Sequence, residues 1–252
     1  IYKRHDNVIV IQSETNRFNE EIICKKELLE KLLSEHPDTD WIFWMDGDTC
    51  LDNRLMEDSF SELYKELERL DSGGYDGARL HNLNLWRSNR YARSDSGFNL
   101  LHPLCFWKNN GDLEFPTTRG LHKRTNPLGI INDNTLPYHL IHYGFSTDEQ
   151  LIERYKLYKS LGQSGNSLNR LLNESGICLW PLSDIVLPSF IDPSHGCKPD
   201  GSYDDRRRSL WDVLNNNIEI IVMIYKSTQY LDFIYDRLKN EHCKADGVLL
   251  YG

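Results

Sequence analysis

The segment that most constrains the fold is Asp40–Asp46, which is apolar from its second residue until it ends in a carboxylate. It reads DWIFWMD, and Asp48 follows after a single glycine. A nearly continuous apolar run of this length is typical of a central strand covered on both faces. We therefore predict a buried strand that presents Asp46 and Asp48 at its end.

The segments around this strand alternate between short apolar runs, which are typical of strands, and apolar residues at helical spacing. Residues 7–12 form a short β-branched run, whereas residues 18–36 carry apolar side chains at helical spacing. A second amphipathic helix is predicted over 53–70 and ends before a Gly-Gly pair. The order strand, helix, strand, helix predicts an α/β fold with a mostly parallel central sheet and helices on its faces.

From residue 75 onward the regular alternation of strand and helix patterns stops. Further strands are predicted over 75–86, 100–108 and 136–143, and helices over 147–161 and 168–173. Residues 109–134 are rich in Gly, Pro, Asn and Thr, and a loop of this length in a compact domain is usually functional or disordered. The α/β pattern then restarts, with strands predicted over 218–225 and 247–251 and a helix over 228–240.

Composition excludes some classes of function. The net charge is −9, and a nucleic-acid binder would instead carry a basic face. An acidic chain can still bind an anionic nucleotide when a cation bridges the charges. The six cysteines show no C-x-x-C pair, so we expect reduced thiols in a cytoplasmic protein.

The Asp-Gly-Asp segment predicts a cation site. Side chains at the carboxyl end of a parallel strand face the crevice where α/β proteins bind ligands. Two carboxylates two residues apart repel each other unless a cation lies between them, and Mg²⁺ or Mn²⁺ suits carboxylate and phosphate oxygens together. The alternative is a polar turn in which Asp48 or Asp52 caps the next helix.

Residues 7–181 resemble the family 2 type of GT-A glycosyltransferases. The resemblance lies in DNVIVIQ, PDTDWIFWMDGDTCLD, GLHKRTNP and LIHYGFSTDEQLIERYKLYKSLG. It implies a Rossmann-like GT-A nucleotide-diphospho-sugar transferase fold. It also implies metal-dependent, inverting transfer of a sugar from a nucleotide-diphosphate sugar to a hydroxyl of a saccharide or glycolipid. Such an enzyme acts in the cytoplasm or peripherally at a membrane surface.

The resemblance also assigns roles to residues. Asp46 would bind the nucleotide and the metal, while Asp48 and His142 would complete the metal site. Arg79 is placed to meet a diphosphate, because Arg matches phosphate oxygens geometrically. Many relatives carry His-Glu where this chain has His122-Lys123. The catalytic base is therefore open between Glu114 and Asp133, with His122 either orienting the acceptor or serving as an ordinary loop histidine.

The resemblance further predicts a strand-helix-strand unit before residue 7. Residues 218–252 look like that unit, so we divide the chain into a domain over 1–217 and a unit over 218–252. Because the chain opens at Ile1 and stops after an apolar run, we expect a piece of a tandem protein in which a second transferase starts near residue 218. A permuted unit that docks on its own sheet is the alternative, and it would place Tyr225 near the nucleotide.

Two other functions fit parts of the sequence. Asp-Gly-Asp-Thr after an apolar run also fits the start of a haloacid-dehalogenase-type phosphatase, in which the first Asp is the nucleophile. That class needs an acidic pair after another strand, and Asp204-Asp205 follows a polar loop instead. A catalytically inactive module that binds a sugar or nucleotide is the second alternative, because Lys123 replaces the glutamate of relatives.

Overall fold

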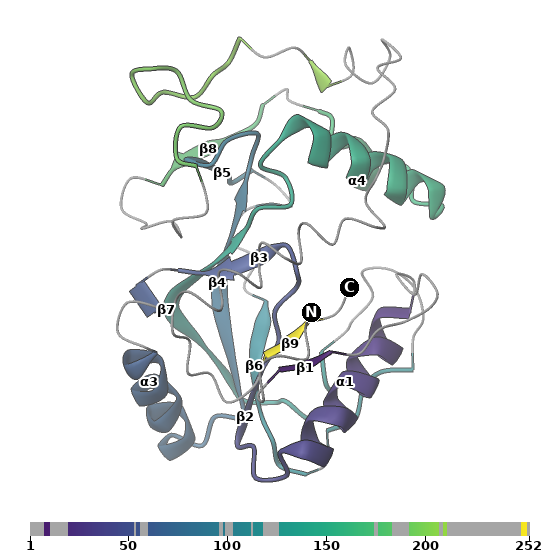
Figure 1. Ribbon diagram of the computed structural model, residues 1–252, viewed down its shortest axis with the longest axis vertical. Helices are drawn as coiled ribbons and strands as arrows, with labels where there is room; N and C mark the ends of the chain where they lie inside the picture. The colour runs from purple at the N-terminus through teal and green to yellow at the C-terminus, as the bar shows by residue number, and fades with distance from the viewer. Residues whose placement is uncertain are drawn as a thin grey trace.

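The computed structural model arranges the chain as one mixed sheet with helices on both sides and a separate pair of short strands (Figure 1). The structure describes residues 8–10, 20–52, 54–55, 60–95, 98, 103–111, 113–117, 126–173, 176–182, 192–206, 209–210 and 248–250.

Within the described residues, the main sheet has seven strands. Five follow one another across it in the order β2 (Trp41–Phe43), β6 (Leu104–Lys108), β4 (Gly77–Leu85), β5 (Tyr91–Arg93) and β8 (Leu179–Pro181). The other two are β7 (Asp133–His142), which pairs with β4, and β3 (Thr49–Leu51), which pairs with β7.

The prediction of a mostly parallel, Rossmann-like GT-A fold is wrong. Of the six strand pairings described in this sheet, β4–β7 is parallel and the other five are antiparallel. β2 and β4 do run in the same direction, as a strand-helix-strand unit requires. However, β6 comes from later in the chain and lies antiparallel between them. Alternation along the sequence gives the direction of neighbouring elements but not which strand is inserted between them.

The apolar run at 40–46 is also not a single central strand. β2 spans three residues and lies at one end of the strand order. The chain then leaves the sheet at Trp44, and its next strand, β3, pairs with β7 instead. The apolar run therefore crosses from one part of the sheet to another and delivers Asp48 to the start of β3.

Helices α1 (Glu21–Glu35) and α3 (Ser61–Ser72) cover opposite faces of the sheet (Figure 1). Side chains alternate along β6, so Trp107 packs with α1 and Phe106 packs with α3. α3 begins later than the predicted helix over 53–70. Phe60 precedes it with φ 65°, a left-handed conformation that an α-helix does not contain.

Helix α4 (Asp148–Ser160) has a well-defined start. Thr147 and Gln150 form a capping box, and Asp148 binds the buried guanidinium of Arg87 through two nitrogens, at 2.7 and 3.0 Å. The helix packs with the short α5 (Asn166–Asn169) in a second core. This core contains Trp86, Phe98, Phe145, Leu151, Ile152, Tyr155, Tyr158, Leu168, Leu171, Leu172 and Leu210.

A parallel pair of short strands forms a second, separate sheet. β1 (Val8–Val10) pairs in register with β9 (Val248–Leu250). β9 falls within the strand predicted over 247–251. The strand and helix predicted over 218–225 and 228–240 lie outside the described residues.

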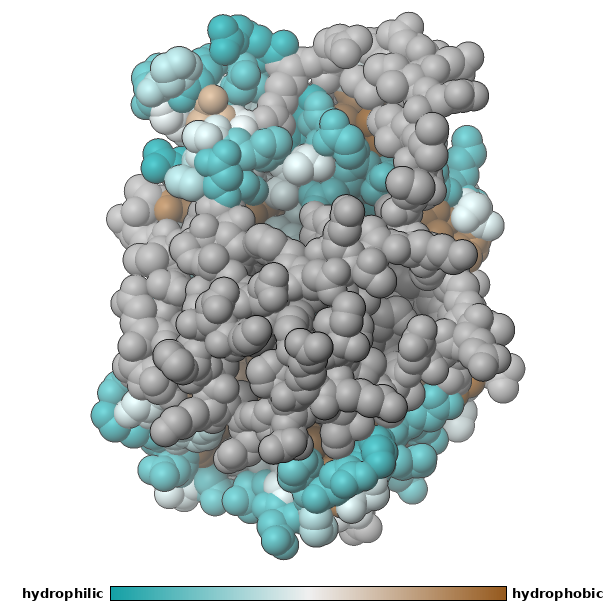
Figure 2. Space-filling model, in the orientation of Figure 1, coloured by the Kyte–Doolittle hydropathy of each residue, from teal (hydrophilic) through white to brown (hydrophobic). Residues whose placement is uncertain are grey.

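Hydrophilic side chains dominate both ends of the face shown in Figure 2, over the α1–α3 end and over the end that carries β5 and β8. Such a surface suits a chain with a net charge of −9. Among the described helices, none combines the length and the apolar character that crossing a bilayer requires.

Candidate functional site

A tight turn places Asp48 at the start of β3. The backbone N–H and the hydroxyl of Thr49 both donate to the carbonyl oxygen of Asp46, at 3.1 and 2.6 Å. The backbone N–H of Tyr143 donates to the carbonyl oxygen of Asp48 at 3.0 Å, and Thr49 pairs with His142 in the ladder. These bonds fix Asp48 beside the end of β7.

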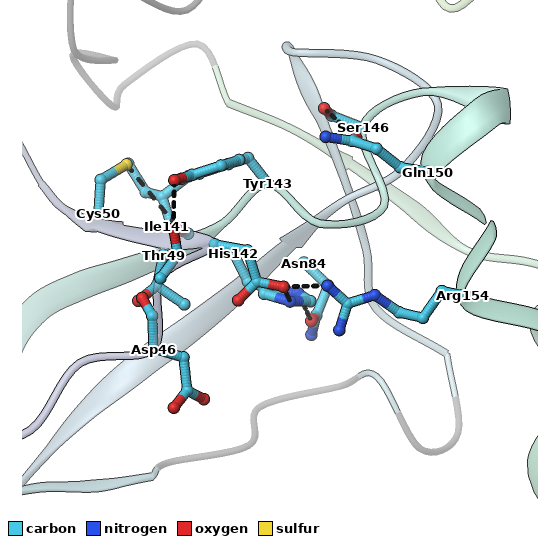
Figure 3. Close-up of polar contacts among 12 residues, drawn as sticks. Asp46, Thr49, Cys50, Asn84, Ile141, His142, Tyr143, Ser146, Gln150 and Arg154 are labelled. Carbon is cyan, nitrogen blue, oxygen red and sulfur yellow. Dashed lines mark hydrogen bonds and ion pairs between the residues drawn. The ribbon is translucent and has the colours of Figure 1, made fainter. Parts of the chain in front are cut away.

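His142 faces Asp48 across this ladder. Its Nε2 lies 3.1 Å from Asp48 Oδ2, and its Nδ1 lies 2.9 Å from Asn84 Oδ1 (Figure 3). The Asn84 amide nitrogen donates to the carbonyl oxygen of Phe98 at 3.5 Å, which leaves the amide oxygen toward His142. The Asn84 amide oxygen therefore faces Nδ1, and Nε2 is the ring nitrogen directed at Asp48.

Arg154 from α4 completes the cluster. Its Nη2 donates to Asp48 Oδ2, the same oxygen that His142 approaches, and its Nη1 donates to the Tyr158 hydroxyl at 3.2 Å. Burial on its own would raise the pKa of Asp48, but His142 and Arg154 outweigh it and hold that pKa well below its usual range. Asp48 is therefore an ionised carboxylate in a partly buried setting, with 27% of its side chain exposed.

Gly144 explains how three side chains meet at one point. A Cβ at this position would lie 2.5 Å from Asp48 Oδ2, 2.5 Å from Arg154 Nη2 and 2.9 Å from His142 Nε2. Any side chain larger than hydrogen would therefore occupy the point on which the three polar atoms converge. The glycine of the His-Tyr-Gly segment is required by this close approach rather than by an unusual backbone angle.

Asp46 does not join this cluster. It is exposed, accepts a hydrogen bond from Trp44 Nε1 at 3.1 Å, and points away from His142 and Arg154 in Figure 3. Within the part of the chain that the structure describes, no group of three or more His, Cys, Asp or Glu side chains is arranged to hold a metal ion. Of the three predicted metal ligands, the structure brings together Asp48 and His142.

The other predicted site residues lie elsewhere. Arg79 binds Asp133 through two nitrogens, at 2.6 and 2.8 Å. This pair lies at the start of β7, roughly 30 Å along the strand from His142. Glu114 is exposed, and its backbone forms an isolated bridge with Leu128. His122 and Tyr225 lie outside the described residues.

Comparisons with models of protein families, with curated proteins and with solved structures find no match to this chain. The defining feature of the cluster is an ionised carboxylate that faces an imidazole nitrogen and a guanidinium at a single point.

Sequence reasoning missed two cationic residues near the acidic turn. Arg154 lies on the helical stripe of Leu151, Tyr155 and Tyr158, and Lys25 lies three residues after Ile22 on the buried stripe of α1. A charged residue on an apolar stripe is the signal that would have found both, because burying a charge requires a partner.

Lys25 is a buried amine beside the turn that holds Asp46. Its Nζ lies 4.5 Å from the centre of the Trp44 ring and 3.4 Å from Glu21. Burial lowers the pKa of Lys25, and the negative charges of Glu21 and Asp46 offset part of this effect. Lys25 therefore supports Trp44, which in turn holds Asp46.

Asp48 and His142 suit a hard divalent cation as two neighbouring ligands. Asp48 Oδ2 and His142 Nε2 lie 3.1 Å apart, and both atoms converge on the point above Gly144. Mg²⁺ is often held by only one or two carboxylates together with substrate phosphates, and Asp48 would be one such carboxylate.

A second buried carboxylate, Asp52, anchors the strand that follows Asp48. It is fully buried, accepts from the backbone N–H and Nε of Arg54 at 3.0 and 2.8 Å, and lies 3.3 Å from His139 Nδ1. Burial would raise the pKa of Asp52, but the hydrogen bonds from His139 and Arg54 lower it to about 2. Asp52 thus joins β3 to β7 through side chains as well as through the ladder.

Asp52 is expected to make stability depend on pH. Its folded pKa of about 2 lies below the ordinary value of 3.8, so its contribution is present above pH 3.8 and is lost as pH falls toward 2. At pH 7 we expect Asp52→Asn to lower the free energy of unfolding by about 2 kcal/mol. The deficit relative to wild type should shrink below pH 3.8. Urea unfolding at pH 7 and at pH 3 measures the loss of unfolding free energy in Asp52→Asn, with substitution of the exposed Asp38 by Asn as the control. A loss that is the same at both pH values would contradict the lowered pKa of Asp52.

Proposed function

We propose that this protein is an enzyme that transfers a sugar from a nucleotide-diphosphate sugar to an acceptor hydroxyl. The observation that carries the proposal is the 3.1 Å approach of Asp48 Oδ2 to His142 Nε2. The two residues are 94 positions apart in the chain; Asp48 immediately precedes β3, and His142 ends β7. An acidic turn and a late histidine that lie this close support a role in binding a metal-bound diphosphate.

In this proposal Asp48 and His142 would hold Mn²⁺ or Mg²⁺, and Asn84 fixes the orientation of the histidine ring. When bound, the cation neutralises the charge that develops on a leaving diphosphate. Asp48 is suited to this task because it stays ionised at neutral pH. Gly144 lacks the Cβ that would otherwise fill the point on which the side chains converge.

The phosphatase alternative is less well supported. It needs Asp46 as a nucleophile beside the cation, whereas Asp46 is exposed and accepts a hydrogen bond from Trp44. A sugar- or nucleotide-binding module without activity would use the same cluster. Turnover of a nucleotide-sugar distinguishes it from the enzyme.

Further parts of the proposal concern the acceptor and the location. We propose a saccharide or glycolipid hydroxyl as the acceptor and inversion at the sugar carbon. Arg79 and Asp133 are not included in the site, because they bind each other at the far end of β7. A cytoplasmic location is supported by the five described cysteines, none of which forms a disulfide.

Thermal unfolding with nucleoside diphosphates, in the presence and absence of Mn²⁺, tests the binding step. We expect nucleotide and Mn²⁺ together to stabilise the wild type by about 2.7 kcal/mol when the ligand is at 100 times its Kd. Asp48→Asn should lose this stabilisation, because an amide is a poor ligand for the cation. Incubation with nucleotide-sugars should then release the free nucleoside diphosphate.

The exposed Asp46→Asn serves as the matched variant for Asp48→Asn. It removes one carboxylate from the same turn but leaves the Asp48–His142–Arg154 cluster intact, so it should keep most of the Mn²⁺-dependent stabilisation. If no nucleoside diphosphate stabilises the wild type with Mn²⁺ or Mg²⁺, the proposed function is wrong. Release of inorganic phosphate from simple phosphate esters would favour the phosphatase instead.

A further inference from the structure

Arg154 occupies the carboxylate oxygen that a cation would use. Its Nη2 donates to Asp48 Oδ2, and His142 Nε2 lies 3.1 Å from that same oxygen. A guanidinium and a divalent cation on one oxygen would bring two positive centres together in a partly buried place, where Coulomb repulsion is weakly screened. A cation can therefore bind well only if Arg154 leaves Asp48.

The surroundings of Arg154 allow its guanidinium to move while α4 stays in place. Nη1 donates to the Tyr158 hydroxyl at 3.2 Å, and the guanidinium carbon lies 5.2 Å from the centre of the Phe145 ring. The start of α4 is held independently by its capping box and by the pair of Arg87 and Asp148. In Figure 3 the side chain extends from α4 toward Asn84 and His142, and 24% of it is exposed.

A diphosphate can bind both positive groups, the divalent cation and the Arg154 guanidinium, after Arg154 has left Asp48. Its oxygens bind a divalent cation, and they also match the planar fork of a guanidinium. With a diphosphate present, Arg154 can exchange the single carboxylate for phosphate oxygens while the cation takes its place on Asp48. Without it, the cation must displace a charge-assisted hydrogen bond and receives no compensating partner for Arg154.

From this arrangement we infer that Arg154 is a diphosphate-binding residue that makes cation binding depend on the diphosphate. The inference rests on the proposed function for the identity of the ligand. It adds that binding of the cation is coupled to binding of the diphosphate. The free protein keeps Asp48 neutralised by Arg154, and cation and diphosphate bind together. Positive coupling between two ligands is reciprocal, so the cation strengthens diphosphate binding by the same factor.

Binding of Mn²⁺ and inorganic pyrophosphate to the whole chain tests the inference. Bound Mn²⁺ is measured by its electron paramagnetic resonance signal, with the complex that forms in solution subtracted. In the wild type we expect pyrophosphate to tighten Mn²⁺ binding about tenfold or more. In Arg154→Gln, Mn²⁺ alone should bind about tenfold more tightly than to the wild type, and the enhancement by pyrophosphate should largely disappear.

Two further variants separate this role from general effects. Arg154→Lys keeps the charge and should retain part of the coupling, whereas Lys156→Gln removes an exposed charge from the same helix and should leave both affinities unchanged. The midpoint of thermal unfolding without ligands shows whether each variant is folded. If Arg154→Gln unfolds, Arg154→Lys carries the test through its weaker coupling.

The outcomes distinguish the inference from the proposed function. If the wild type binds Mn²⁺ with pyrophosphate but Arg154→Gln changes neither the affinity for Mn²⁺ alone nor the coupling, the inference is wrong and the proposed function stands. If the wild type binds neither ligand alone nor the two together, the proposed function fails and the inference fails with it. Coupling that is lost in Arg154→Gln and partly kept in Arg154→Lys supports both.

Discussion

Gly144→Ala is expected to lower turnover of a nucleotide-sugar about 100-fold, the loss typical of a displacement of about 1 Å in a reacting site. The added Cβ would lie 2.5 Å from Asp48 Oδ2 and from Arg154 Nη2, which is closer than real Cβ contacts allow. At least one of these side chains must therefore move away from the point where they converge. Steady-state kinetics with the nucleotide-sugar measures the effect.

The same substitution should leave the fold nearly intact. All three atoms that the Cβ meets are at the ends of side chains, so they can shift without moving β7 or α4. The midpoint of thermal unfolding without ligands should therefore remain close to that of the wild type. Gly47→Ala is the control in this unfolding measurement. It also replaces a glycine by alanine, but a Cβ at that position would have no atom within 4 Å. Full turnover by Gly144→Ala would show that the cluster is not the active site.

Asp148→Ala is expected to lower the free energy of unfolding by about 3–5 kcal/mol, the usual effect of breaking a buried ion pair. The Arg87 side chain is 2% exposed, and its Nε and Nη2 both donate to the Asp148 carboxylate. Removing the Asp148 carboxylate deprives the buried Arg87 guanidinium of the negative charge in this ion pair. Urea unfolding at neutral pH measures the loss.

Glu149→Ala is the matched control for this loss. Glu149 also lies in the first turn of α4, so it interacts with the helix dipole in the same way, but its side chain is exposed. We expect its replacement to change the free energy of unfolding by less than about 0.5 kcal/mol. Equal effects of the two substitutions would mean that the helix dipole, rather than the buried pair, dominates at Asp148.

Local structure was largely accessible from the sequence, whereas the pairing of strands was not. The periodicity of residues 18–36 predicts α1, and the capping residues around Thr147 mark the start of α4. Periodicity is a property of neighbouring residues, so it carries no information on which distant strand lies alongside. For that reason nothing in residues 100–108 indicates that β6 lies antiparallel between β2 and β4.

The candidate site shows the same division. Asp48 and His142 attract attention in the sequence because each adjoins an apolar run, and the structure places them 3.1 Å apart. Arg87 suggests a solvated loop, yet it is buried because Asp148, 61 positions away, neutralises it. Charges that are satisfied by distant partners look like surface charges in a linear sequence.

The backbone ladder between β3 and β7 determines when the entropy cost of placing Asp48 beside His142 arises. Asp48 and His142 are spaced by hydrogen bonds between strands, including the bond from Tyr143 to the Asp48 carbonyl oxygen, and not by the closing of a loop. The loss of conformational entropy that brings the two side chains together therefore occurs once, when the chain folds. Under the proposed function, a cation would therefore bind to a preorganised pair, and little of its interaction energy would be consumed in ordering these two side chains.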